Sequence, residues 1–170
     1  MKIETIFEQV LYSCRFKGEA LNEFYKCLEL WTDVGNLYDF AKRNNVRDNY
    51  NFIEQILTDV SEIQELITQI YETKESFEKY FHPLQSNENN KKLLSFRKGK
   101  YKTNQLRFYA IRIDVNCFLI TGGAIKMSQK MSDHPDTIKE LVKLDKARKH
   151  LYKNGIFDCD SFFELITEST

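Results

Sequence analysis

The chain has 170 residues, of which 42% are apolar, so a domain of this size can bury a core without disulfides or metal ions. Six Gly and two Pro exclude a collagen-like or disordered chain, and four scattered cysteines without a CxxC pair exclude a zinc ribbon or a thioredoxin-like site. The 25 basic residues balance 25 acidic ones, so any electrostatic preference for a partner must come from where the charges lie.

The N-terminal residues and the cysteines indicate the compartment. The first eight residues contain two glutamates and no apolar stretch of the kind found in signal peptides. The longest apolar run, residues 117–125, is too short to span a bilayer. Scattered thiols are typical of a reducing compartment, so we expect a cytoplasmic protein with no membrane partner. Two disulfides in an exported protein are the alternative.

The first 85 residues are predicted to be mainly helical and acidic. A strand is expected at 11–16, where aromatic and alternating apolar positions precede a turn. Apolar residues three or four positions apart then predict helices at 21–31 and 34–41. The longest stripe with a helical period runs from 50 to about 74, and acidic residues occupy its other face.

After a polar loop at 86–90, the apolar period changes from 3.6 to 2. Strands are expected at 93–97, 106–113 and 117–127. The link between the last two has the length and residue types of a hairpin turn. Both of these strands are apolar on both faces, so each side of the sheet must be covered. Two helices are expected after the sheet, from about 135 to 153 and from 160 to 168.

The predicted fold class is therefore α+β. Residues 1–85 are expected to form a helical N-terminal region with one or two strands, and residues 91–170 a small antiparallel sheet flanked by helices. Gly122 and Gly123 lie inside the last strand, where they predict a bulge or the close approach of another backbone.

Positive charge is concentrated in residues 91–130. This segment holds ten basic residues and one acid, a net charge of +9, and the other 130 residues carry 15 basic against 24 acidic residues. Such an asymmetry predicts a site for a polyanion, most simply a nucleic acid. One alternative is that the acidic part of the chain packs against the basic part and neutralises it, which would leave a structural or interaction protein. The other is that the basic residues form a solvated face.

An RNA site in this segment would use its cations and tyrosines. Metal-independent RNA cleavage needs cations that hold the scissile phosphate, a group that helps to deprotonate the 2′-hydroxyl, and a group that protonates the leaving oxygen. Alternation along the strand at 106–113 places Arg107 and Arg112 on opposite faces. Aromatic side chains can stack on bases. The candidate RNA-binding residues are Arg97, Lys98, Lys100, Tyr101, Lys102 and Tyr109.

The sequence carries no motif for a metal or a cofactor. It contains no nucleotide-binding glycine loop, no HExxH and no nucleophile elbow. His82, His134 and His150 lie far apart and share no metal-ligand spacing. His134 could shuttle a proton, and a capping or surface role is the alternative for it. We therefore predict neither a metal nor a cofactor.

The order of motifs from residue 77 to 153 points to a known family. A strand with arginines at 106–112 is followed by a short turn and by an apolar strand at 117–126 with lysines at its exit, and a basic helix comes after a proline. This order resembles the RelE/HigB-type toxins of bacterial type II toxin–antitoxin systems. Members of that family fold as a small antiparallel sheet with packed helices, and many cut messenger RNA at the ribosome.

The resemblance implies an endoribonuclease that needs no metal. By position, Arg107 and Arg112 match the arginines of the family's strand, and Lys126 and Lys130 match its lysines, so these four are the candidate catalytic residues. The implied partners are RNA or the ribosome and a cognate antitoxin of helix-turn-helix type. Because relatives with this fold bind gyrase and cut nothing, the alternative is a non-enzymatic protein-binding module, either a gyrase-type inhibitor or a defence-system interaction protein.

Overall fold

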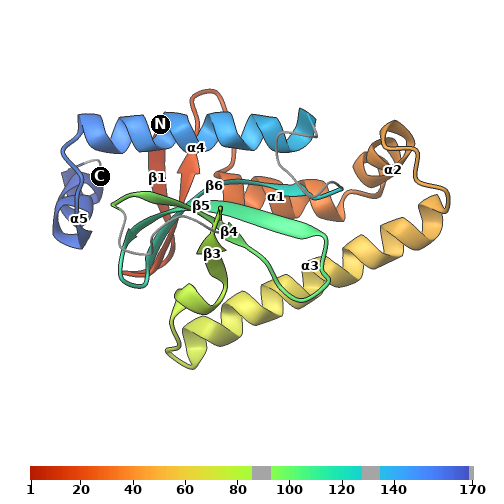
Figure 1. Ribbon diagram of the computed structural model, residues 1–170, viewed down its shortest axis with the longest axis horizontal. Coiled ribbons are helices and arrows are strands. Elements are labelled where there is room, and N and C mark those ends of the chain that lie inside the picture. Colours follow the sequence, from red (N-terminus) through yellow and green to blue (C-terminus); the bar gives the residue numbers. More distant parts are fainter. Residues whose placement is uncertain (86–92, 128–134, 169–170) are drawn as a thin grey trace.

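The protein is built on one six-stranded sheet that is covered by helices on both faces (Figure 1). The structure, a computed structural model, describes residues 1–85, 93–127 and 135–168. Across the sheet the strands follow the order β1-β2-β6-β5-β4-β3. Their bounds are Lys2–Phe7 for β1, Leu11–Arg15 for β2, Phe81–Pro83 for β3, Ser95–Gly99 for β4, Leu106–Asp114 for β5 and Cys117–Ile125 for β6.

Five α-helices and one turn of 3-10 helix surround the sheet in the described residues. Their bounds are Glu23–Thr32 for α1, Val34–Arg43 for α2, Asn49–Glu72 for α3, Phe77–Lys79 for the 3-10 turn η1, Pro135–Lys153 for α4 and Cys159–Glu168 for α5. Asn22, Asp33 and Asp48 cap the first three helices, because each side chain accepts a hydrogen bond from the backbone N–H three residues later. None of the described helices combines the length and the apolar character needed to cross a membrane.

The predicted layout, a helical N-terminal region followed by a small RelE-like antiparallel sheet, is wrong. The chain begins with a β1–β2 hairpin, and β2 pairs in parallel with β6, so the sheet is mixed. Strands that precede and follow residues 86–90, the predicted polar loop, which lies outside the described residues, belong to this one sheet. A parallel pair between strands so distant in the chain has no local turn signal, which is why periodicity missed it. β1 was missed because, as an edge strand without a fully buried residue, it lacks a strong apolar pattern.

The predicted antiparallel pairing of β5 with β6 is confirmed. Between Tyr109 and Ala110 of β5, the register shifts by one residue. Thr121 of β6 is skipped in the pairing and forms a β-bulge, directly before the glycine pair that predicted it. The bulge increases the local twist and lets the strand bend where two helices pack on it.

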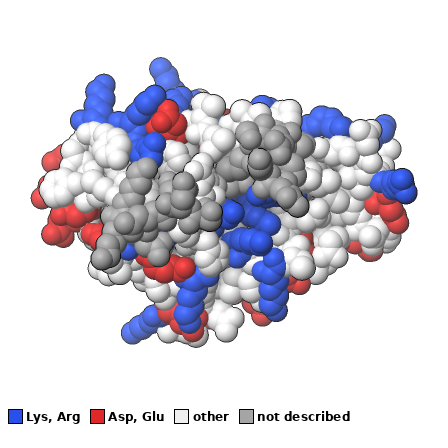
Figure 2. All heavy atoms as spheres, in the orientation of Figure 1, with Lys and Arg blue, Asp and Glu red and all other residues white. Residues whose placement is uncertain are grey.

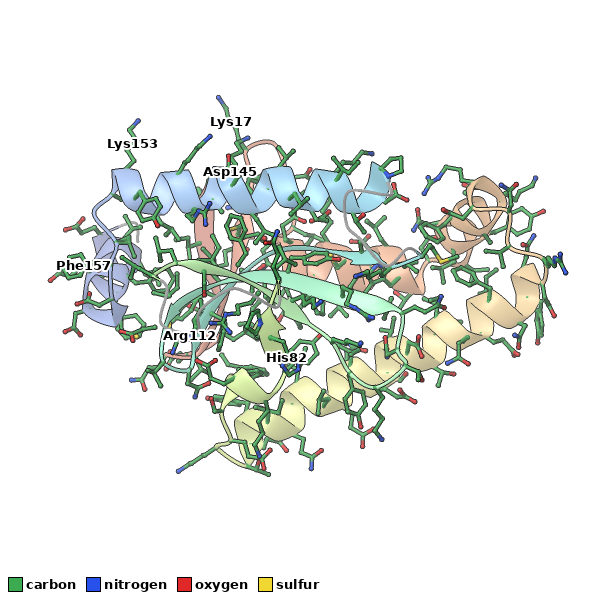
Figure 3. All side chains as sticks on the ribbon, viewed as in Figure 1. Lys17, His82, Arg112, Asp145, Lys153 and Phe157 are labelled. Atoms are coloured by element: carbon green, nitrogen blue, oxygen red, sulfur yellow. The ribbon has the colours of Figure 1, made fainter. Side chains whose placement is uncertain are left out.

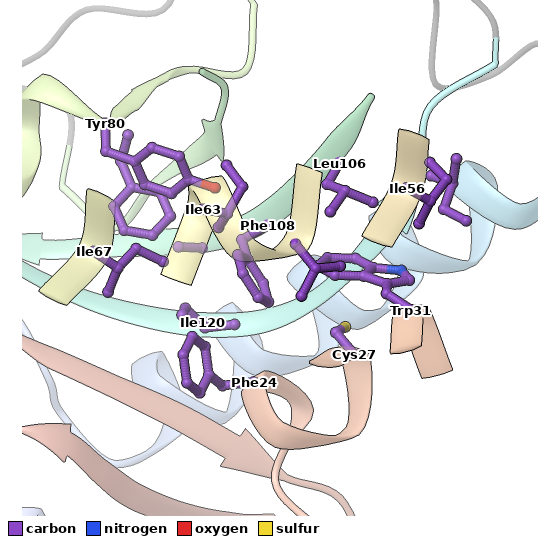
Figure 4. Packing of buried hydrophobic residues seen from close by; sticks show 14 of the residues in the cluster. Phe24, Cys27, Trp31, Ile56, Ile63, Ile67, Tyr80, Leu106, Phe108 and Ile120 are labelled. Carbon is purple, nitrogen blue, oxygen red and sulfur yellow. The ribbon is translucent and has the colours of Figure 1, made fainter. Parts of the chain in front are cut away.

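Two hydrophobic cores fill the spaces between the sheet and the helices. In the core under α1 and α3, Phe108 of β5 packs on Phe24 and Trp31, with ring centroids 5.2 and 5.0 Å away (Figure 4). The second core lies under α4 and α5, where Leu144 and Phe162 are fully buried. β5 and β6 supply side chains to both cores, which confirms that helices cover both faces of these strands.

Gly122 and Gly123 let helices approach β6 from both sides. A Cβ atom at Gly123 would lie 2.8 Å from the carbonyl oxygen of Arg107 and 2.9 Å from the ring of Trp31 in α1. A Cβ atom at Gly122 would collide with the carboxylate of Glu140 in α4. The strand therefore needs glycine at both positions for α1 and α4 to pack on it.

Gly123→Ala is expected to destabilise the protein by about 1–3 kcal/mol, because overpacking against backbone and an indole ring forces both to move. The measurement is urea unfolding of the purified variant against the parent chain. Val115→Ala, at a position that is 71% exposed, is the control and should shift stability by less than about 0.5 kcal/mol. Equal stability of the two variants would contradict the described packing of α1 on β6.

Candidate nucleic-acid interface

A row of residues crosses four strands on the face of the sheet toward α4. Antiparallel pairing places His82 of β3 opposite Lys98 of β4, Lys98 opposite Tyr109 of β5, and Tyr109 opposite Gly122 of β6. Directly paired residues project from the same face of a sheet. Since Gly122 lies against Glu140 of α4, the whole row belongs to the α4 face.

Three more cations lie beside this row. Lys100 follows Lys98 by two residues, and Arg107 precedes Tyr109 by two. Lys126 comes directly after β6, four residues past the row. Alternation along β5 puts Arg107 on the face of the row, and Lys100 and Lys126, which follow the ends of β4 and β6, lie near enough to Lys98 and Arg107 for their charges to interact. We call Lys98, Lys100, Arg107 and Lys126 the cationic face. Figure 2 shows lysine and arginine side chains gathered near the middle of the molecule in this view.

The members of the cationic face lie close enough to influence one another. Burial lowers the pKa of Lys98, and the charges of Lys100 and Arg107 lower it further. Burial also lowers the pKa of Lys126, with added contributions from the other three cations. Among the described residues, none of the four forms a salt bridge with a carboxylate. An anion with several charges would relieve their repulsion.

Arg107 is held in place by the chain itself. Its Nη1 donates hydrogen bonds to the carbonyl oxygens of Asn104 and Leu106. Its Nε is buried and has no acceptor among the described residues. The guanidinium therefore has a fixed position before any ligand arrives, which reduces the entropy lost on binding an anion.

Arg97, one of the predicted RNA-binding residues, is buried on the opposite face of β4. It is 1% exposed, and its Nε donates a hydrogen bond to the hydroxyl of Ser95, 3.1 Å away. Alternation along β4 puts Arg97 and Lys98 on opposite faces. Lys98 reaches the cationic face, whereas Arg97 belongs to the interior.

Neither of the predicted stacking tyrosines offers its ring to a base on the cationic face. Tyr109 is fully buried, and burial raises the pKa of its hydroxyl to about 12, so its ring cannot stack on a base without leaving the core. Tyr101 packs against the core under α3. With Lys102, whose ammonium lies 5.0 Å from the Tyr101 ring centroid, it lines a hollow shared with Glu62 and Glu65 of α3. Tyr101 and Lys102 therefore lie beside α3 and do not belong to the cationic face.

Of the four candidate catalytic residues, the structure brings Arg107 and Lys126 together. Arg112 lies on the other face of β5, as alternation predicted, and its Nε donates to the Glu78 carboxylate 2.7 Å away. We leave Arg112 out of the candidate site because it is already paired. Lys130 lies outside the described residues.

His82 is the residue of this surface that the sequence analysis set aside. It lies on β3, a strand of three residues that ends at Pro83. So short a strand has no measurable apolar period, and nothing local in the sequence indicates that it pairs with β4. Only the pairing of these two strands, which are separated by eleven residues of sequence, brings His82 beside Lys98.

A buried charge cluster fixes α4 to α1 at the end of the row. The ammonium of Lys143 in α4 lies 3.0 Å from the Glu23 carboxylate of α1 and 3.1 Å from that of Glu140. Both carboxylates are almost completely buried, and Oε2 of Glu140 has no hydrogen-bond partner among the described residues. In the described part of the chain, no three His, Cys, Asp or Glu side chains are grouped so that they could hold a metal ion.

Comparison with protein-family models, with curated proteins and with solved structures finds no match to this chain. The interpretation of the cationic face therefore depends on its own geometry. The resemblance to RelE/HigB-type toxins, which rests on the order of motifs in residues 77–153, stays a prediction.

Glu140→Gln should change how stability depends on pH. Burial raises the pKa of Glu140 from 4.5 to about 7, so the folded state holds this proton more tightly than the unfolded state does. The contribution of this group is fully present below pH 4.5 and is lost as the pH rises to about 7, by about 3 kcal/mol at most. In Glu140→Gln the side chain cannot ionise, so the variant should not lose this stability as the pH rises.

Urea unfolding of both proteins at several pH values between 4 and 8 is the measurement. We expect the parent chain to lose stability relative to Glu140→Gln as the pH rises through this window. A difference between the two proteins that stays constant with pH would show that Glu140 ionises in the folded state as it does in water.

Proposed function

We propose that this protein binds single-stranded RNA through the cationic face. The observation that carries the proposal is the gathering of four cations from β4, β5 and the ends of β4 and β6 on one face, without a salt bridge to a described carboxylate. Lys98 and Lys126 are separated by two strand spacings, about 10 Å, and by a further four residues, about 13 Å, along the strand, so they can contact separate phosphates.

The shape of the site favours a single strand over a DNA duplex. The cations lie on a sheet and on the turns that leave it, whereas proteins that read duplex DNA commonly insert a helix into the major groove. Single strands bind well to sheet surfaces with cationic grooves. Because Tyr109 is buried and Tyr101 packs on the α3 side, we expect contacts to phosphates and sugars to dominate, and hence weak sequence preference.

Within this proposal, the protein acts as a toxin on RNA or the ribosome in the cytoplasm and is held in check by a cognate antitoxin. The support for this part is the resemblance in residues 77–153 together with the cationic face. The difference between the observed mixed sheet and the family's antiparallel sheet leaves RNA binding as the better supported part.

RNA binding should fall steeply as salt rises, because each phosphate contact releases counterions. Lys98→Gln and Lys126→Gln should each weaken binding of a short single-stranded RNA by about fivefold and lower the log–log salt slope by about one. Lys153→Gln, at the far end of α4, removes the same charge outside the cationic face and should leave both values unchanged (Figure 3). Fluorescence anisotropy at several salt concentrations gives both quantities.

Three results would contradict RNA binding at the cationic face. They are no binding at low salt, binding that does not change with salt, and an equal loss of affinity in Lys153→Gln and in the two cationic-face variants. Thermal melting of each variant separates lost binding from lost folding.

The toxin part of the proposal has its own measurement. Induced expression in a bacterial host should arrest growth, and the double variant with Lys98→Gln and Lys126→Gln should relieve the arrest at equal protein level, because it no longer holds RNA. If the parent chain and the double variant are equally toxic, toxicity does not act through the cationic face.

A further inference from the structure

We infer that the RNA-binding surface also cleaves RNA, with His82 as the general base that takes the 2′-hydroxyl proton and Lys98 as the acid that protonates the leaving 5′-oxygen. The inference rests on the proposed RNA binding. It adds a catalytic pair, neither of whose members is among the residues that the family resemblance implies.

His82 lies where a base beside a bound phosphate is needed. In the β3–β4 pair it is the direct partner of Lys98, and residues so paired have Cβ atoms about 4.5–5.5 Å apart on the same face. The imidazole is exposed, and among the described residues no donor or acceptor engages it. It is therefore free to contact a ligand held by Lys98.

The surroundings of His82 keep its imidazole neutral, as a base requires. Burial lowers the pKa of His82 below 6.5, and the charges of Lys98, Arg97 and Lys100 lower it further. The charged groups of the preceding turn η1 are already engaged, since Glu78 pairs with Arg112 and Lys79 pairs with Glu75. No described carboxylate forms a salt bridge with His82 and so stabilises its protonated form.

Lys98 is suited to act as the general acid that protonates the leaving 5′-oxygen. Burial and the charges of Lys100 and Arg107 lower the pKa of its ammonium below 10.5, which makes it a better proton donor than an ordinary lysine. Arg107 and Lys126 remain to offset the charge that develops on the phosphate, and the fixed guanidinium of Arg107 does so without reorganisation.

The reaction balances without a further reactant. His82 accepts the 2′-hydroxyl proton, the 2′-oxygen forms a bond to phosphorus, the bond from phosphorus to the 5′-oxygen breaks, and Lys98 protonates that oxygen. The products are a 2′,3′-cyclic phosphate and a free 5′-hydroxyl. Exchange of protons with water then returns His82 to its neutral form and Lys98 to its charged form.

Other titratable groups near the row are less well placed. Glu140 lies over β6, three strand positions or about 14 Å from β3, and its carboxylate is buried against Gly122. Tyr109 is fully buried between β4 and β6. His82, which is exposed, and Lys98, which is half-buried, are the titratable pair in direct register.

The test uses the full chain and a labelled single-stranded RNA that contains every dinucleotide step, with an all-2′-deoxy copy as control. We expect cleavage of the RNA alone, with products that end in a 2′,3′-cyclic phosphate. His82→Gln should keep the parent's RNA affinity and melting temperature and should lower the cleavage rate on the order of 100-fold or more. His150→Gln on α4 is the matched control and should cleave at the parent's rate.

Two further measurements separate catalysis from binding and folding. The cleavage rate of the parent chain should rise with pH through the pKa of His82 and level off below neutrality, and His82→Gln should lose this rise. Added imidazole should restore part of the rate in His82→Gly. Lys98→Gln should lose both affinity and rate, because this residue holds the phosphate and protonates the leaving group.

RNA binding without cleavage, cleavage of the all-2′-deoxy strand, or full activity of His82→Gln would each overturn the inference and leave the proposed RNA binding intact. Absence of RNA binding by the parent chain would overturn both. A His82→Gln protein with lost affinity and an unchanged rate at saturating RNA would make His82 a binding residue, which also overturns its assignment as the base.

Discussion

β6 is the strand on which the rest of the structure depends, because both of its edges and both of its faces are occupied. It bonds to β2 on one edge and β5 on the other, and its side chains enter both cores. α4 packs mainly on β6 and β5, and the sheet continues past them to β4 and β3. Lys98 of β4 therefore lies beyond the two strands on which α4 mainly packs.

The charge asymmetry of the chain has two structural outcomes. On the α3 side the acidic and basic parts meet, since Glu78 pairs with Arg112 and the Asp59 carboxylate accepts the backbone N–H of Gln105. On the α4 side none of the four residues of the cationic face forms a salt bridge with a described carboxylate, although the charge of the Asp59 carboxylate acts on Arg107. Neutralisation by the acidic part thus accounts for Arg112 and leaves Lys98 and Lys126 for a partner, which is the physical basis for the proposed RNA binding.

The sequence predicted those elements that interactions between residues close together in the chain determine. The helices α1 to α5 and the β5–β6 hairpin follow from apolar period and turn residues, and alternation along β5 correctly separated Arg107 from Arg112. The pairing of β2 with β6 and of β3 with β4 depends on segments that are distant in sequence or divided by a loop, and no local signal encodes it. The same holds for the candidate site. The sequence identified Lys98 and Lys126 as basic residues, but it did not predict that His82 lies beside Lys98.

The short strand β3 has a consequence for how the molecule meets other chains. An exposed sheet edge is a template on which a foreign strand can add, and long, regular edges are the ones that lead to aggregation. β3 offers three residues, and the last is Pro83, which has no N–H to donate. The edge that carries His82 is thus a poor template for the addition of a strand from another chain.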